Sequence, residues 1–375
     1  MDTRALPGRR TIFAFIFLIA ALLLASGCSL GPKALKGNRI DYNISIHKSN
    51  NEDLLVNLVR ASYFEPIFFL QVGSVSSSFN YGATVGAKGT LTEFRSPSAP
   101  NYVETSVGAS FSEVPTITYA PLQGSQAIRQ LIAEIPPDRF LLLSRSGWSI
   151  AAMLWTTVHH IGPLYNYSNN WPKDHPLIGS YRGFLELSAI WGGMQNREEL
   201  DLPGLDKDSG GLPVIPVLMK FQNAQDAEKI DRLLGIKSEK TALPDGRLKA
   251  KVNLALRCDT GVASCVPIKM KSFFNVLYDI SQIGVQDNDK RIPWMKALPD
   301  DLRSRRGLHS GLIHVRASSA SPAGAYVAVN YRGAWHYIAE EDFNSRAFFS
   351  LLGLLFSLQS AEIPVAQPLL TIPTR

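Results

Sequence analysis

Apolar residues recur at the spacing of a helix in several segments of the chain. In the first, leucine and valine residues between positions 54 and 59 share one helical face. Ser49 precedes them in a capping box, as the N-cap. With Ser125, Ser149 and Ser272 as further caps, the pattern predicts helices at about 50–65, 126–134, 150–161, 181–195, 224–234, 273–283 and 344–359.

The pattern changes between residues 74 and 119. Ser, Gly, Thr and Asn alternate there with Val, Phe, Tyr and Ala, most regularly over 78–86 and 105–111. A period of two indicates antiparallel strands with one wet face. Such strands also occur in outer-membrane proteins, but these are too few to form a closed transmembrane sheet by themselves. We therefore interpret the segment as a small sheet or a protruding hairpin.

Shorter strand-like runs alternate with the predicted helices. They lie at 67–72, 214–221, 248–256, 266–270, 312–316, 326–331 and 334–338. The last two are joined by Arg332–Gly333, which predicts a tight turn. The final helix contains an apolar stretch, 348–356, that is too short to cross a bilayer and reads as a core helix. This mixed order predicts an α+β fold of mixed small antiparallel sheets packed with amphipathic helices.

The Gly- and Pro-rich stretch that ends at residue 213 is the best candidate for a linker. We accordingly expect five parts. They are a signal peptide (1–27), a lipidated tether and lead-in (28–47), a strand-then-helix N-terminal domain (48–205), the linker itself (206–213) and an α+β C-terminal domain (214–375).

The N-terminus has the three parts of an export signal. Arg4, Arg9 and Arg10 precede an apolar run over 12–25, and two small residues lead to Cys28. The run is shorter than the roughly 20 residues of a membrane-spanning helix, so an uncleaved anchor is the weaker interpretation.

Leu24-Ala-Ser-Gly-Cys28-Ser resembles the lipobox of type II signal peptides. That resemblance implies that the Cys28 thiol receives a diacylglycerol, that cleavage occurs just before it and that the new amino group is acylated. Several acyl chains would anchor the protein lastingly to a lipid bilayer. Ser29 implies sorting to the periplasmic face of the outer membrane. Ala25 departs from the family, which usually has leucine there, and an ordinary secretory signal with an incidental cysteine is the alternative.

Composition narrows the class of protein further. A hydrophobic content of 45% is typical of a folded protein. The formal charge of +6 includes three arginines and one aspartate of the signal, so the mature chain is only mildly basic, and no nucleic-acid partner is expected. With Cys28 acylated, Cys258 and Cys265 remain, and an oxidising periplasm favours a local disulfide between them.

Parts of the mature chain resemble conserved hypothetical lipoproteins of Gram-negative bacteria, a family without an assigned activity. The similar stretches are 41–43, 51–60, 69–72, 115–124, 146–148, 331–338 and parts of 342–352. After Arg60, Ala61–Glu65 departs from the family, which tends to show a further Arg-Tyr pair and an acid before the proline. The resemblance therefore implies a compartment and a single family fold, but no chemistry.

No catalytic or cofactor motif stands out, so we expect no catalytic residue, no metal site and no cofactor. Ser146 and Ser310 stand beside glycines but not in a nucleophile elbow. His159 and His160 are adjacent, so on a helix they would point about 100° apart and could not easily share a metal. The alternating acids after Asp206 suggest calcium, but the loop lacks the later glutamate.

Surface-type aromatic residues are the remaining candidates. Tyr165, Tyr167 and Trp171 cluster with asparagines, and such planes can bind sugars or a protein partner. Arg332 at the turn, beside Trp335, suggests an anion site.

The leading expectation for function is a non-enzymatic binding or scaffold lipoprotein with an envelope protein partner. One alternative is a membrane-tethered hydrolase of cell-wall or polysaccharide material. The other is an accessory subunit of an export or secretion machine.

Overall fold

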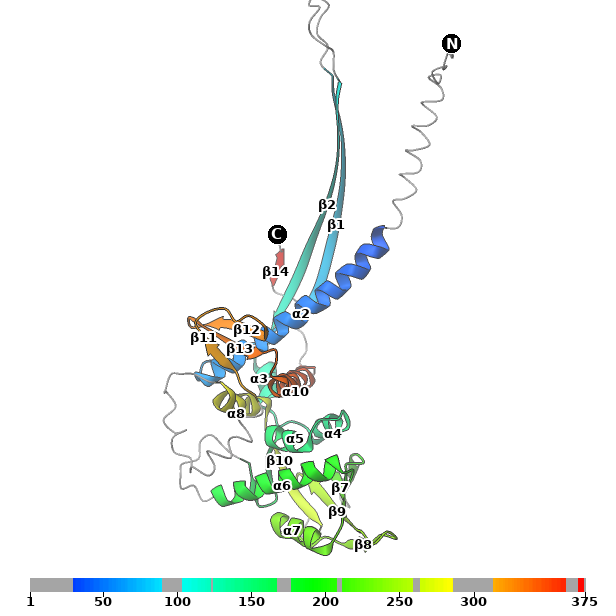
Figure 1. Ribbon diagram of the computed structural model, residues 1–375, viewed down its shortest axis with the longest axis vertical. Helices are drawn as coiled ribbons and strands as arrows, with labels where there is room; N and C mark the ends of the chain where they lie inside the picture. The colour runs from blue at the N-terminus through cyan, green and yellow to red at the C-terminus, as the bar shows by residue number, and fades with distance from the viewer. Residues whose placement is uncertain are drawn as a thin grey trace, which may run out of the picture. The chain divides into compact units, whose positions relative to one another are not determined.

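The computed structural model describes residues 30–89, 103–122, 124–166, 177–207, 211–258, 264–285, 313–361 and 370–373 (Figure 1). Its described helices and several small sheets follow one another in mixed order, which confirms the α+β prediction. By its internal contacts the chain divides into two compact units, Met1–Asn51 and Glu52–Arg375. Nearly all the described elements belong to the second.

The first helix begins earlier than the sequence pattern predicts. Helix α2 spans Leu30–Ser62, so residues from Leu30 onward are helical, and Ser49 lies inside the helix. The prediction of Ser49 as an N-cap is wrong. Because the helix continues before it, the N–H groups of the following turn have carbonyl partners and need no cap.

Seven further helices are described. They are α3 (Ser125–Ile132), α4 (Pro137–Arg145), α5 (Ile150–Thr157), α6 (Ile178–Asn196), α7 (Ala224–Leu234), α8 (Phe273–Gly284) and α10 (Phe343–Ser360). The Ser149 and Ser272 hydroxyls accept the Ala152 and Asn275 N–H groups at 3.4 and 3.2 Å, which confirms both caps. Ser125 is not a cap, because α3 already begins there after Gly124.

The largest sheet has the strand order β4-β3-β10-β9-β7-β5, with β6 on β7 and β8 on β9. Its strands are β3 (Val158–Ile161), β4 (Leu164–Tyr165), β5 (Leu200–Asp201), β6 (Asp206–Lys207), β7 (Pro213–Phe221), β8 (Lys240–Ala242), β9 (Leu248–Ala255) and β10 (Cys265–Met270). The helix predicted over 150–161 therefore ends at Thr157. Residues 158–161 form β3 instead, because they pair with β10, an element remote in sequence.

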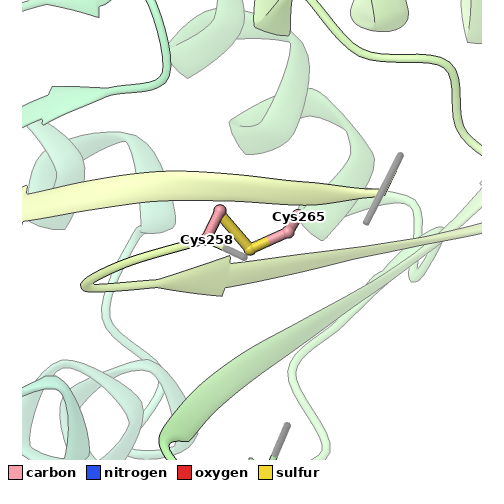
Figure 2. The surroundings of a disulfide bond; sticks show 2 residues. All are labelled: Cys258 and Cys265. Carbon is pink, nitrogen blue, oxygen red and sulfur yellow. A yellow bond between two sulfur atoms is a disulfide. The ribbon is translucent and has the colours of Figure 1, made fainter. Parts of the chain in front are cut away.

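One strand pair of this sheet is parallel. Only three residues of β9, Asn253–Ala255, pair with β10, beginning at Cys265. Parallel neighbours usually need a long crossover. Here the start of β10 lies beside the end of β9, so the chain does not have to return along a whole strand and a short loop suffices. The Cys258–Cys265 disulfide closes that loop with a Cα–Cα distance of 5.7 Å (Figure 2), which confirms the predicted pairing.

The other two sheets are built from hairpins. Strands β1 (Leu70–Gly89) and β2 (Val103–Pro121) are antiparallel throughout and appear as a long pair in Figure 1, with β14 (Leu370–Pro373) on β2. Strands β11 (Arg316–Ser318), β12 (Ala325–Tyr331) and β13 (Ala334–Ala339) have the order β11-β13-β12. Arg332 and Gly333 have φ of 53° and 81°, so the tight turn is confirmed as a left-handed two-residue hairpin turn.

The hydrophobic core joins the elements of Glu52–Arg375. Phe348, Phe349, Leu351, Leu352 and Leu355 of α10 are buried in it, as the sequence predicts for a core helix. Within the described part of the chain, no helix combines the length and apolarity needed to span a membrane.

Both described ends of the predicted linker, 206–213, are in paired strands: Asp206–Lys207 form β6, and Pro213 begins β7. β6 pairs with β7, and β5, which precedes the stretch, is a neighbour of β7 in the same sheet. The contact units give no boundary at this stretch, and the division into separate domains on either side of it stays a prediction.

Candidate functional site

The β1–β2 hairpin has open strand edges among the residues that the structure describes. Its sheet has the order β1-β2-β14, and β14 covers only Thr116–Tyr119 of β2. Among the described residues, the outer edge of β1 and the edge of β2 before Thr116 therefore have no neighbouring strand. Such open edges present rows of backbone donors and acceptors that can take a further strand.

The distal part of the hairpin has a narrow polar face. Thr84 pairs with Gly108, and Gly86 pairs with Ser106. The Thr84 hydroxyl donates to the Gly108 carbonyl at 3.3 Å, and the Ser106 hydroxyl donates to the Gly86 carbonyl at 3.4 Å. A Cβ on Gly108 or Gly86 would lie 2.8 or 2.7 Å from those hydroxyl oxygens. A side chain at Gly86 or Gly108 would therefore displace the hydroxyl that crosses from the other strand. All four residues are exposed.

The base of the hairpin is fixed to α2 by Asn57, which is fully buried. Its Oδ1 accepts the Phe68 N–H at 2.8 Å, and its Nδ2 donates to the Phe68 carbonyl at 2.7 Å. One turn earlier, Asp53 accepts the Leu70 N–H at 3.3 Å. Burial raises the pKa of Asp53 to about 6, although hydrogen bonds from Leu70 and Asn57 and the charge of Arg60 oppose the shift. Together these polar groups set the point at which β1 begins.

Arg332 lies in a cluster that brings the C-terminal end of α2 to the β12–β13 turn. Its guanidinium binds the Glu65 carboxylate at 3.0 Å and lies 4.7 Å from the centre of the Tyr63 ring. The Tyr331 hydroxyl donates to the other Glu65 oxygen. The Glu65 carboxylate already neutralises the charge of Arg332. The predicted anion site is therefore occupied by a side chain of the protein itself. Trp335 is half-buried in β13, opposite Asn330.

Tyr165 lies against the two histidines of β3. Its ring centre is 4.9 Å from that of His160 and 6.0 Å from that of His159. Burial, His160 and then Lys271 and Lys269 lower the pKa of His159 to about 4, so this imidazole is neutral near pH 7. Burial also lowers the pKa of His160. Tyr167 and Trp171, which the sequence grouped with Tyr165, lie outside the described residues.

Sequence reasoning missed a pocket of about 260 Å³ between α6, α7 and β7. Glu199 is buried beside it and accepts Arg197 Nε at 2.8 Å and Gln222 Nε2 at 2.7 Å. The Gln222 hydrogen bond comes first among the causes that lower the pKa of Glu199. Lys229 on the rim is paired with Glu186 at 2.6 Å. The charges of Arg197, Glu199 and Lys229 are thus paired within the protein. No sequence motif could have revealed the pocket, because its residues come from three separate segments.

Ser146 and the group formed by His314, Asp342 and Ser345 have structural roles. Ser146 Oγ donates to the Leu142 carbonyl at 2.8 Å. His314 and Ser345 meet at Asp342, with Ser345 Oγ at 2.7 Å and His314 Nδ1 at 3.5 Å from the same oxygen. The hydroxyl thus donates to the acid and not to the imidazole, and Asp342 caps α10. Ser310 lies outside the described residues.

Two further predictions concern ions and the anchor. Within the described part of the chain, no group of three His, Cys, Asp or Glu residues is placed to hold a metal. Asp206 is at the start of β6, and 208–210, the rest of the suggested calcium loop, are outside the described ranges. Cys28 is outside them as well, so its acylation stays a prediction.

Comparison of the chain with protein-family models, with curated proteins and with solved structures found no match. The fold and the local geometry therefore define an α+β protein with a long open-edged hairpin, and its function has to be argued from those features.

Proposed function

We propose that this protein is a lipid-anchored component of the bacterial outer membrane, on its periplasmic face, that binds or scaffolds another envelope component. The observation that carries the proposal is the β1–β2 hairpin, whose two strand edges are open over most of their described length. Addition of a strand to such an edge is a general mode of protein recognition, since the backbone itself supplies the hydrogen bonds.

Two other features support the location. The Cys258–Cys265 disulfide is typical of an oxidising compartment such as the periplasm. The N-terminal sequence, with its basic start, apolar run and Cys28, resembles a lipoprotein signal. An acylated Cys28 would keep the hairpin close to membrane components and so raise their effective concentration.

The test is an affinity pull-down of the tagged protein from detergent-solubilised membranes, with one substitution on the hairpin. Thr84→Lys places a charge on the exposed face of an edge strand, where lysine hinders strand addition. Thr241→Lys makes the same change on β8, which is exposed and outside the hairpin. We expect a stoichiometric partner with the native protein and with Thr241→Lys, and its loss with Thr84→Lys.

The outcome also separates the remaining alternatives. Recovery of integral membrane proteins of a transport complex would identify an accessory subunit of an export machine. Recovery of the protein alone from the outer-membrane fraction would contradict the binding proposal and leave the hydrolase alternative to be tested. A Cys28→Ser variant should move from the membrane to the soluble fraction; if the native protein is itself soluble, the anchor is wrong.

A further inference from the structure

The pocket between α6, α7 and β7 has an apolar wall. The wall is formed by one side of α6 and by β7, through Ala189, Ile190, Gly193, Met194 and Phe221. Ligand pockets are usually walled in this way, with a few polar groups that fix the orientation of the ligand. The volume of about 260 Å³ lies just below the range of pockets that hold drug-sized molecules, about 300–1,000 Å³. The space therefore suits a small molecule that has an apolar part.

Gly193 leaves part of this space open. A glycine inside a helix costs stability relative to alanine. The neighbouring Gly192 has a packing reason, because a Cβ there would lie 3.1 Å from the Cβ of Ala151 in α5. Among the described residues, apart from its own helix backbone and chain neighbours, a Cβ on Gly193 would meet only the end of the Arg197 side chain, at 3.3 Å. Packing between elements does not explain this glycine, whereas room in the pocket does.

The charged residues that line the pocket leave one cation and one anion over. The charges of Arg197, Glu199 and Lys229 are paired within the protein. Lys220 of β7 and Asp226 of α7 also line the pocket, and both are exposed. Within the described part of the chain, neither of these two side chains forms an ion pair. The pocket therefore offers a positive and a negative group to a ligand.

Both groups can take a ligand charge in their local surroundings. Lys220 is directly opposite Lys249 of β9. Like charges in that position repel each other, so an anion beside Lys220 would relieve the repulsion. Asp226 accepts Asn223 Nδ2 at 3.1 Å. A carboxylate has about four lone-pair sites, so Asp226 keeps the capacity to accept an ammonium group as well.

We propose that this pocket binds a small zwitterion with an apolar side chain, which is the chemistry of a free apolar amino acid. Lys220 binds the carboxylate, Asp226 binds the ammonium group, and the apolar side chain packs against Met194 and Phe221. A ligand with only one charge would leave the other residue without a partner, so the pocket selects molecules that carry both charges. The pocket lies outside the β1–β2 hairpin, and its occupancy does not depend on the proposed function.

The test is equilibrium dialysis of the full-length protein, in detergent and near neutral pH, against tritiated L-leucine. We expect saturable binding that unlabelled L-leucine displaces. N-acetyl-L-leucine lacks the positive charge and L-leucinamide lacks the negative charge. Each should need about tenfold higher concentrations to compete, because each loses a hydrogen bond to a charged group. L-serine has both charges but no apolar side chain, and it should compete as poorly.

Matched variants assign the binding to this pocket. Lys220→Met and Asp226→Asn each remove one of the two charges and should weaken leucine binding about tenfold. Lys249→Met and Glu228→Gln remove the same charges at exposed positions of β9 and α7 that do not line the pocket. Because exposed charges are screened by salt, these controls should bind within about twofold of the native protein. Gly193→Leu fills the space while both charges stay in place, and it should abolish binding.

Several results would overturn the inference. The native protein must bind leucine saturably, and the absence of such binding would reject the amino-acid site. Equal competition by either singly charged analogue would show that the pocket does not need both charges, and equal competition by serine would reject the apolar wall. If Lys220→Met and Asp226→Asn bind leucine as their controls do, the ligand is not held in this pocket. The urea unfolding midpoint of each variant shows that a loss of binding is not a loss of the fold.

Discussion

Replacement of Asn57 by alanine should destabilise the protein more than its small change in size suggests. Asn57 is 0% exposed and forms two short hydrogen bonds to the backbone of Phe68, where the chain passes from α2 to β1. Alanine can supply neither the acceptor for the Phe68 N–H nor the donor for its carbonyl. Two backbone polar groups then lose their partner, and this local change would loosen the start of the hairpin.

The magnitude follows from those two groups. A buried donor or acceptor left without a partner costs about 1–3 kcal/mol. Phe68 itself is half-buried, so water can satisfy part of the demand. We therefore expect the free energy of unfolding to fall by about 2–4 kcal/mol.

Urea unfolding followed by tryptophan fluorescence measures this loss. The midpoint should fall while the slope with urea stays unchanged, since the native surface is the same. Asn344→Ala is the matched control, because Asn344 is exposed in the first turn of α10, and it should change stability by less than about 0.5 kcal/mol. If Asn57→Ala unfolds with the midpoint of the control, the two Phe68 bonds do not hold the base of the hairpin.

Three further predictions concern other parts of the fold. The pKa of His159 is about 4 in the folded protein and 6.5 ordinarily. Between these pH values the unfolded chain binds more protons than the folded one, so stability falls as the pH drops from 6.5 to 4. His159→Gln should flatten that part of the stability–pH curve, and an unchanged slope would refute the buried neutral imidazole. Replacing both Cys258 and Cys265 by serine should cost about 2.5 kcal/mol in urea unfolding, from the entropy of the short loop, and a loss below about 0.5 kcal/mol would show that the bridge adds nothing. Tyr331→Phe removes the hydroxyl that donates to Glu65 and should cost about 1–3 kcal/mol in the same assay, because a hydrogen bond to a charged group is lost; a neutral effect would mean that the Arg332 ion pair alone satisfies Glu65.

Features that depend on neighbours in the chain were predictable. Helix α7 is observed at Ala224–Leu234, the predicted range, because its apolar spacing and its end at Gly235 are local signals. The Arg332–Gly333 turn and the short Cys258–Cys265 loop are local in the same way. The alternation over 74–119 predicted antiparallel strands, in a small sheet or a hairpin, because a period of two is visible within a single strand.

Features that depend on contacts remote in sequence were not predictable. Residues 158–161 continue a helical pattern but form β3, because β10 offers a strand edge more than a hundred residues later. Ser49 has the spacing of a cap, yet the helix that precedes it makes a cap unnecessary. Local propensity is a weak preference that tertiary pairing overrides.

The candidate sites also divide into features set by neighbouring residues and features set by contacts remote in sequence. The sequence by itself determined the export signal pattern, the disulfide and the two-faced character of 74–119, because each is written in adjacent or alternating residues. Only the tertiary structure decided that Arg332 meets Glu65, that Glu199 closes against Gln222 and that both edges of the hairpin lie open along most of their described length. Charge pairing and edge exposure depend on which distant segments the hydrophobic core brings together, and a one-dimensional pattern carries no record of that choice.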